Sequence, residues 1–228
     1  MTVPGDTHVE CNSPDVLEIT NWLLTTTRAV RRRLDLDRAV PDAILAECLT
    51  IACQAPTGGG RQNWRWVIVR DSSQRRAIAE LYREVSLERF HDTVRTTEDP
   101  TTRRVYESAT RLAEVLDQVP VLVLACIEGR SDGTQARDAA LFGSVVPAVW
   151  SFQLALRARG LGSTYVTAHL AAADRIATLL DIPPGVTQVA MLPVAYTRGT
   201  EFKTAARQPI SQVCFGDRWG RPWEPRSS

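Results

Sequence analysis

The chain has 228 residues, of which 44% are hydrophobic and 23% are charged, and its formal net charge is +1. This composition is typical of a soluble globular protein with a substantial core, and it excludes low-complexity and collagen-like chains. The small net charge gives no general electrostatic reason to expect binding to nucleic acid or to an anionic membrane. Because no change of composition marks a boundary, we expect a single domain over 1–228.

Helices and apolar strands alternate along the chain, and helices outweigh strands. Ser13-Pro14-Asp15 and Val40-Pro41-Asp42 are typical helix starts, because proline fits the first turn of a helix. The predicted helices cover 14–26, 41–55, 72–82, 102–117, 134–159 and 174–180. The predicted strands cover 64–69, 119–127, a stretch after Gly160, and 186–196. This order predicts a layered α/β or α+β domain.

Three segments depart from a simple amphipathic pattern. The polar residues 91–104, rich in Thr and Asp, predict a mobile loop. The stretch 134–159 is apolar on nearly all sides in its middle, which predicts a helix in the core or in an interface, kinked or broken at Pro147. Beyond the core, expected over 12–200, the polar residues 201–228 predict a C-terminal extension that must dock on another surface or stay disordered.

Several features indicate a cytoplasmic protein without a membrane span. The most apolar run, 139–158, contains Pro147, Gln153 and Arg157, which favours a buried core helix. The five cysteines follow neither a metal nor a disulfide spacing, so we interpret them as reduced and mostly buried. No signal-peptide pattern opens the chain.

A basic cluster follows the first predicted helix, in the sequence TTTRAVRRRLD. Its four arginines are Arg28, Arg31, Arg32 and Arg33. A solvated basic patch is the simplest interpretation. However, Arg28 and Arg31 are about one helical turn apart and could converge on one anion, and a guanidinium group offers paired donors that suit phosphate.

A glycine-rich loop separates the second predicted helix from the first strand, in the sequence APTGGGRQNWRWV. It is neither a P-loop nor a dinucleotide-binding fingerprint, because it follows a helix and precedes a strand. The loop is either a flexible turn or a backbone that lies against a flat ligand. In the second case, Thr57 and Gln62 are available for hydrogen bonds.

Other candidate residues are weaker when taken alone. In GLGSTYVTAHL, Gly160 is a helix terminator, and His169 is more often a core or surface residue than a base. Arg207, in KTAARQPISQV, is by itself a surface arginine. No pattern of histidines and cysteines indicates a metal site, and neither Ser144 nor Ser163 lies in a nucleophile-elbow motif.

The order of these segments is more specific than any one of them. The chain carries in turn RAVR, VPDAILAECLTIACQAPTGGGRQNWRWVIV, LALRARGLGSTYV, DIPPGVTQVAMLPVAYTRG and ARQPISQV. This order resembles the nitroreductase family of FMN-dependent oxidoreductases over nearly the whole chain. The resemblance implies an α+β three-layer sandwich, with a central, mostly antiparallel sheet flanked by helices. It also implies a homodimer with FMN at the subunit interface and a C-terminal extension that wraps the partner.

The resemblance also implies a cofactor-binding set. Arg28, Ala29, Arg31 and Arg32 match the basic segment that holds the FMN phosphate and the pyrimidine end of the ring, and Arg207 matches a C-terminal phosphate ligand. Thr57, Gly58, Gly59, Gly60 and Gln62 match the loop beside the flavin. Tyr165, Val166, Thr167 and Ala168 match the segment behind it. Ala29 stands where the family has serine, and Gly60 where it has asparagine, so the individual phosphate ligands remain open.

The function that the resemblance implies is ping-pong hydride transfer. NAD(P)H reduces the flavin, and a nitroaromatic, quinone or enone then takes its place and is reduced, without a catalytic side chain or a metal. A second interpretation keeps the fold but assigns dehalogenation, azoline oxidation or flavin fragmentation. A third is FMN binding or storage without turnover. A fourth treats the arginines as a solvated patch and the glycines as a turn.

Overall fold

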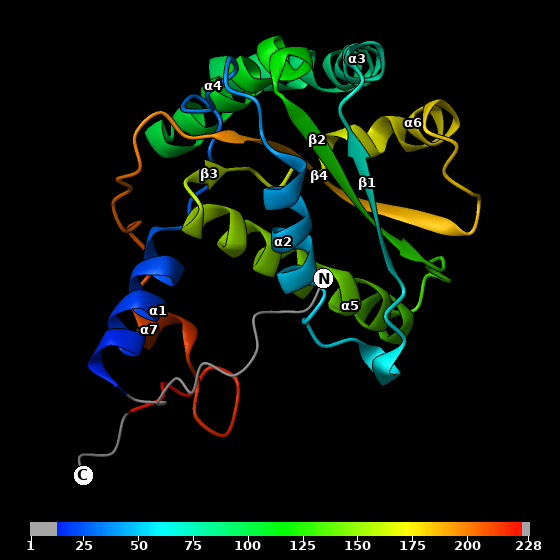
Figure 1. Cartoon of the computed structure of the whole chain (residues 1–228). Helices are drawn as coiled ribbons and strands as arrows, with labels where there is room; N and C mark the ends of the chain where they lie inside the picture. Colours follow the sequence, from blue (N-terminus) through cyan, green and yellow to red (C-terminus); the bar gives the residue numbers. More distant parts are fainter. Residues whose placement is uncertain (1–12, 225–228) are drawn as a thin grey trace.

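The computed structural model describes residues 13–224 (Figure 1). Cys11 and the last four residues of the predicted extension lie outside this range. The helices are α1 (Pro14–Thr26), α2 (Asp42–Ala52), α3 (Ser72–Thr96), α4 (Pro100–Val115), α5 (Gln135–Ala158), α6 (Ala173–Leu179) and α7 (Ile210–Val213). The strands are β1 (Trp64–Val69), β2 (Val121–Glu128), β3 (Leu161–Gly162) and β4 (Val186–Tyr196). Short 3-10 turns cover Gly58–Gly60, Leu116–Gln118 and Ala168–Ala172.

The four strands form one sheet in the order β1-β2-β4-β3. All three pairs are antiparallel, with β1 on β2, β2 on β4 and β3 on β4. A register shift between Ala125 and Cys126 interrupts the β2–β4 pair. Helices and an antiparallel sheet therefore form the predicted α+β fold.

The strand β2 explains why the fold has three layers. Alternate side chains of a strand point to opposite faces, and here both sets are buried. Val121, Val123 and Ile127 belong to the core formed with α2 and α5, whereas Leu122 and Leu124 belong to the core formed with α3, α4 and α6. Figure 1 shows these two groups of helices on opposite sides of the sheet. The prediction of a strand buried on both faces is confirmed.

The helix α5 lies across one face of the sheet and remains helical through Pro147. Its inner side chains, such as Val149 and Phe152, are fully buried. On the outer side, Phe142, Val146 and Trp150 follow one another every four residues and are 37%, 40% and 42% exposed. This spacing places three large apolar side chains in one stripe that no other part of the described chain covers.

Among the described residues, α5 is also the one helix that is long and apolar enough to cross a membrane. Half of its most apolar window is buried inside the fold. Core helices of soluble proteins meet the same criterion of length and composition, so this property is weak evidence for a membrane span.

The prediction of a mobile loop over 91–104 is wrong. Residues 91–96 end α3, and residues 100–104 begin α4. Asp99 caps α4 by accepting hydrogen bonds from the backbone N–H groups of Thr101 and Thr102, at 3.0 and 2.9 Å. Phe90 and Tyr106 hold the two helices together by an edge-to-face contact at 5.6 Å. The cap at Asp99 and the contact between the two aromatic rings therefore help to order a mainly polar stretch.

Candidate functional site

The basic segment between α1 and α2 adds an irregular edge to the sheet. The N–H of Val30 donates to the carbonyl of Ser163 at 2.9 Å, and the N–H of Asp35 donates to the carbonyl of Tyr196 at 2.8 Å. Val30 and Leu34 are buried, with exposed fractions of 4% and 3%. These two anchors fix the backbone of the segment against β3 and the end of β4, so its arginines have a defined position.

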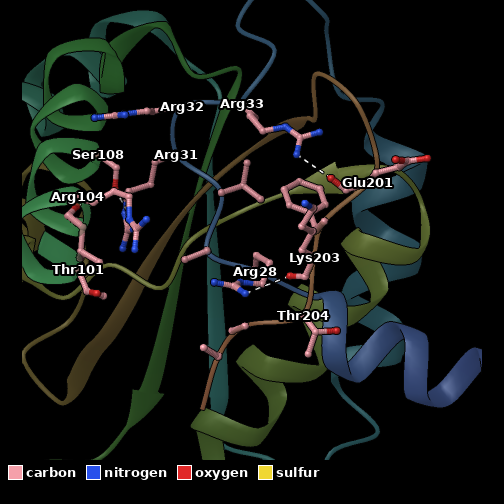
Figure 2. Close-up of a pocket in the computed structure, with 16 residues that line it drawn as sticks. Arg28, Arg31, Arg32, Arg33, Thr101, Arg104, Ser108, Glu201, Lys203 and Thr204 are labelled. Atoms are coloured by element: carbon pink, nitrogen blue, oxygen red, sulfur yellow. Dashed lines mark hydrogen bonds between the residues drawn. The ribbon is translucent and has the colours of Figure 1, made fainter. Parts of the chain in front are cut away.

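The arginines line a cavity of about 760 Å³ (Figure 2). Its walls come from the basic segment, from α4 and from the chain that follows β4. Six cationic side chains line the cavity, together with one carboxylate, that of Glu201. The cationic side chains are Arg28, Arg31, Arg32, Arg33, Arg104 and Lys203. The charge of this surface suits an anionic ligand.

Two of the arginines hold the C-terminal extension in place. Arg28 donates to the carbonyl of Lys203 at 3.2 Å. Arg33 donates to the carbonyls of Arg198 and Glu201, at 2.9 and 2.8 Å, and lies over the ring of Phe202. The extension thus becomes one wall of the cavity.

The other two arginines of the basic segment lie against α4, in different electrostatic environments. Arg32 forms an ion pair with Glu107 at 3.3 Å, so its charge is partly offset. Arg31 is half-buried, donates to the hydroxyl of Ser108 at 3.4 Å, and forms no ion pair within residues 13–224. Burial lowers the pKa of the Arg31 guanidinium. A partly desolvated cation without a counter-ion is costly, and an anionic ligand would remove that cost.

The predicted glycine loop is an ordered turn in a different place. The hydroxyl of Thr57 accepts a hydrogen bond from the N–H of Gln62 at 3.3 Å, and the N–H of Gly58 donates to the hydroxyl of Ser144 at 3.0 Å. Gly59 and Gly60 have φ angles of 64° and 65°, a conformation that favours glycine. The loop therefore lies on the first half of α5, and its glycines are exposed.

Within one chain, the glycine loop and the basic segment are well separated. The loop binds α5 at Ser144, whereas the basic segment binds the chain at Ser163, beyond the C-terminal end of α5. The part of α5 from Ser144 to Ala158 spans roughly 20 Å at 1.5 Å per residue. Figure 1 shows the loop near the start of α5 and the basic segment at the opposite side of the molecule. These two predicted parts of the site do not meet within the chain.

The segment from Tyr165 to Ala168 begins two residues after Ser163, whose carbonyl accepts the hydrogen bond from Val30 of the basic segment. Val166 exchanges two backbone hydrogen bonds with Met191 of β4, at 3.0 and 2.9 Å. Tyr165 is 36% exposed, and Thr167 precedes the 3-10 turn that begins at Ala168. The segment is fixed to the sheet at Val166, three residues after Ser163, and its side chains do not line the cavity.

Two further candidates have contrasting surroundings. Arg207 is exposed, and its guanidinium donates to the neighbouring carbonyl of Ala206, which lines the cavity. His169 is fully buried, and neither ring nitrogen has a hydrogen-bond partner among the described residues. Burial lowers the pKa of His169 to about 4. A neutral, solvent-inaccessible imidazole does not serve as a base, which agrees with the interpretation of His169 as a core residue.

The sequence interpretation missed the wall that α4 contributes. Thr101, Arg104, Val105 and Ser108 line the cavity from one face of this helix. Their spacing of three, four and seven residues is typical of a helix face, and this signal was available in the sequence. The predicted helix over 102–117 contains Arg104, Val105 and Ser108, but the sequence does not show that this helix packs beside the basic segment.

The chain belongs to the nitroreductase family, whose model matches residues 24–196. The matched region includes the sheet, the basic segment, the glycine loop and α4, and it ends at the last residue of β4. Among curated proteins, none matches the chain at a significant level.

Solved structures with the same fold include proteins of different activities. One is oxidised iodotyrosine deiodinase bound to FMN and 3-iodo-L-tyrosine, with 22% identity, a TM-score of 0.66, and coverage of 86% of this chain and 96% of that chain. A second is a BluB-like flavoprotein from Clostridium difficile 630, with 20% identity, a TM-score of 0.63, and coverage of 84% and 95%. A third is a nitroreductase-like family protein from Bacillus cereus, with 20% identity, a TM-score of 0.61, and coverage of 92% and 97%. At these identities the likeness establishes the fold.

Proposed function

We propose that the protein is an FMN-dependent NAD(P)H oxidoreductase that acts as a cytoplasmic homodimer. The observation that carries this proposal is the cationic cavity beside β3, in which Arg31 has no counter-ion within residues 13–224. Membership of the nitroreductase family supports the same conclusion. When bound, FMN would supply a centre that takes hydride from NAD(P)H and passes it to a nitroaromatic, quinone or enone.

The residues of the cavity fit the anionic end of FMN. Arg28 and Arg31 present guanidinium groups to the same space, and Arg207 lies directly after the cavity wall. A phosphate monoester carries about two negative charges at neutral pH and accepts several hydrogen bonds. In this assignment, Arg28, Arg31 and Arg207 bind the phosphate and the pyrimidine end of the ring. The positive charge of Arg31 would also stabilise negative charge at the pyrimidine end of the bound cofactor.

The glycine loop enters the proposed site from a second copy of the chain. Two observations support this arrangement. The loop is exposed and lies far along α5 from the basic segment. Large apolar side chains also remain exposed on α1, α5 and α7, and a subunit interface would bury them. These side chains are Leu17, Ile19, Trp22, Leu24, Phe142, Val146, Trp150, Ile210 and Val213. In this dimer, Thr57 to Gln62 of one subunit face the basic segment of the other, behind which Tyr165 to Ala168 lie.

Mixed dimers test the composite site. One subunit carries Arg28→Ala and Arg31→Ala, the other carries Gly59→Val and Gly60→Val, and two different affinity tags allow isolation of the mixed dimer. A composite site predicts about one FMN per mixed dimer, because one site receives both intact parts. Each parent homodimer is expected to bind FMN weakly. A mixed dimer that binds no more FMN than either parent would contradict the composite site.

The alternative functions, which are dehalogenation, azoline oxidation, flavin fragmentation and FMN storage, predict other results for the wild-type protein than the NAD(P)H oxidoreductase does. Uptake of FMN followed by reduction with NADH or NADPH supports the oxidoreductase. Uptake of FMN without reduction by either nucleotide would favour a reaction that uses no nicotinamide, or FMN storage. Gel filtration of the same preparation tests the homodimer.

A further inference from the structure

We propose that Arg104, together with the hydroxyl groups of Thr101 and Ser108, forms an anion-binding subsite on α4 that selects ligands with a carboxylate or phosphate group. The inference rests on the proposed function, because the ligand in question is the one that exchanges over the flavin. It assigns a substrate class to a wall of the cavity that the sequence interpretation did not include.

The position of Arg104 is fixed by the helix that carries it. The cap at Asp99 sets the start of α4, and Tyr106 and Ala113, on another side of the helix, attach it to the core. Thr101, Arg104 and Ser108 then lie on the face that lines the cavity. The side chains of this face can therefore bind a ligand without a rearrangement of the helix.

Arg104 differs from the other arginines of α4. Arg103 donates to the carbonyl of Thr97, and Arg111 forms an ion pair with Glu114 at 3.1 Å. By contrast, the side chain of Arg104 forms neither a hydrogen bond nor an ion pair within residues 13–224, and it lines the cavity. The carboxylate of Asp99 is committed to the helix cap, and that of Glu107 to Arg32. Hydrogen bonds from Thr102 and Thr101, and to a smaller degree the charge of Arg104, lower the pKa of Asp99, but no hydrogen bond or ion pair holds the Arg104 guanidinium among the described residues.

The charge of the cavity exceeds what FMN requires. Glu201 and Glu107 offset two of the six cationic side chains. The phosphate of FMN would offset about two more charges. A surplus of about two positive charges then remains in a cavity that is open to solvent, which favours a second anionic group.

Arg31 and Arg104 bracket the place where this second group would bind. Arg31 donates to Ser108, which lies one helical turn after Arg104 on α4. Figure 2 shows Arg31, Arg104, Ser108 and Thr101 grouped at the α4 side of the cavity, with Arg33 and Glu201 at the other side. A guanidinium fork with neighbouring hydroxyl donors is suited to a carboxylate or a phosphate.

Two ligands could bring this anionic group. One is an electron acceptor with a carboxylate, and the other is NADPH with its 2′-phosphate. Pairs of probes distinguish these two ligands, because the two members of each pair differ chiefly in whether they carry the charged group. The first pair is 4-nitrobenzoate and 4-nitrobenzamide, and the second is NADP⁺ and NAD⁺.

The experiment measures dissociation constants by calorimetry, with oxidised, FMN-loaded protein and no turnover. The variants are Arg104→Gln, Arg104→Lys and the control Arg111→Gln, which removes the same charge from the same helix outside the cavity. We expect Arg104→Gln to weaken binding of one charged probe about tenfold, in the range for hydrogen bonds between charged groups. The dissociation constant of the neutral or less charged probe of the same pair should change by less than about twofold. Arg104→Lys should recover part of the affinity, and Arg111→Gln should match the wild type.

The pattern of results identifies the source of the anion. A selective loss for 4-nitrobenzoate assigns the subsite to the acceptor, and a selective loss for NADP⁺ assigns it to the reductant. An equal effect on both members of each pair, or no effect on any probe, would overturn the inference while leaving the oxidoreductase intact. Uptake of FMN is measured first: a wild-type chain that takes up none would refute the proposed function and the inference together.

Discussion

Gly162 lies so close to Val30 that a Cβ atom on the glycine would stand 2.9 Å from the Cβ atom of the valine. The same added atom would stand 2.6 Å from the methyl group of Thr197. Real Cβ atoms do not approach other atoms so closely. The absence of a side chain at Gly162 therefore allows the basic segment to pack against β3, and this packing sets the position of its arginines.

The substitution Gly162→Ala is expected to displace the basic segment. Overpacking of this kind costs about 1–3 kcal/mol, and we expect both the stability of the protein and its affinity for FMN to decrease. Urea unfolding and a flavin titration measure the two effects. Gly185→Ala is the matched control, because the added Cβ would have no neighbour within 4 Å. If Gly162→Ala and Gly185→Ala have the same stability and the same affinity for FMN, the contact with Val30 is unimportant.

Arg31 and Arg32 are adjacent, but we expect them to contribute differently to FMN binding. Arg32 is offset by Glu107, whereas Arg31 is half-buried and has no counter-ion within residues 13–224. Loss of a charge-assisted hydrogen bond costs about 1.5–3 kcal/mol, so Arg31→Ala should weaken FMN binding at least about tenfold. Arg32→Ala should weaken it by less than about threefold. A titration followed by flavin fluorescence provides both values, and the reverse order would contradict the assignment of Arg31.

The glycine loop allows a test of backbone conformation without steric conflict. A Cβ atom at Gly60 would meet nothing within 4 Å, but the residue has a φ angle of 65°. Asparagine tolerates this left-handed conformation and β-branched residues do not. We therefore expect Gly60→Asn to be nearly neutral, whereas Gly60→Val should lower the free energy of unfolding by about 1–2 kcal/mol. Thermal unfolding of the two variants decides the point, and equal stability would mean that the loop does not hold this conformation.

Buried His169 predicts a loss of stability in mild acid. The unfolded chain takes up a proton at about pH 6.5, whereas burial lowers the pKa of His169 in the folded protein to about 4. The unfolded state therefore binds more protons in this window, and stability falls as the pH decreases through it. Between about pH 6.5 and 5 the expected loss is roughly 1–2 kcal/mol. Urea unfolding at both values measures it, and His169→Gln should flatten the dependence. If the free energy of unfolding of His169→Gln depends on pH as steeply as that of the wild type, groups other than His169 cause the loss of stability.

Much of the fold follows from local patterns in the sequence. The helix start at Ser13-Pro14 and the strands of the central sheet were predicted within a few residues, because their caps and apolar runs are local signals. The last part of α3 and the first two residues of α4 do not follow from the sequence, since this stretch is mainly polar and the aromatic contact beside it joins two different helices. The cap at Asp99-Pro100 has the same form as the one at Ser13-Pro14 and marks the start of α4 two residues before the predicted start at 102.

The spatial arrangement of the predicted site residues does not follow from the sequence. The family order of motifs identified the basic segment and the glycine loop from the sequence. Their separation along α5 depends on tertiary packing, so it does not follow from local patterns in the sequence. The contribution of Arg104 and Ser108 likewise depends on how α4 packs beside the segment. Convergence of distant side chains is the part of a site that local patterns do not encode.

The measurement that tests the central claim most directly is the visible absorption spectrum of the FMN-treated protein during anaerobic addition of NADPH and then NADH. We expect flavin bands that remain with the protein through gel filtration, bleach when one nucleotide is added, and return with a nitroaromatic or quinone acceptor. Arg28→Ala/Arg31→Ala protein should lose the bands during gel filtration. A wild-type protein that retains no flavin, or flavin bands that neither nucleotide bleaches, would contradict the proposed FMN-dependent oxidoreductase.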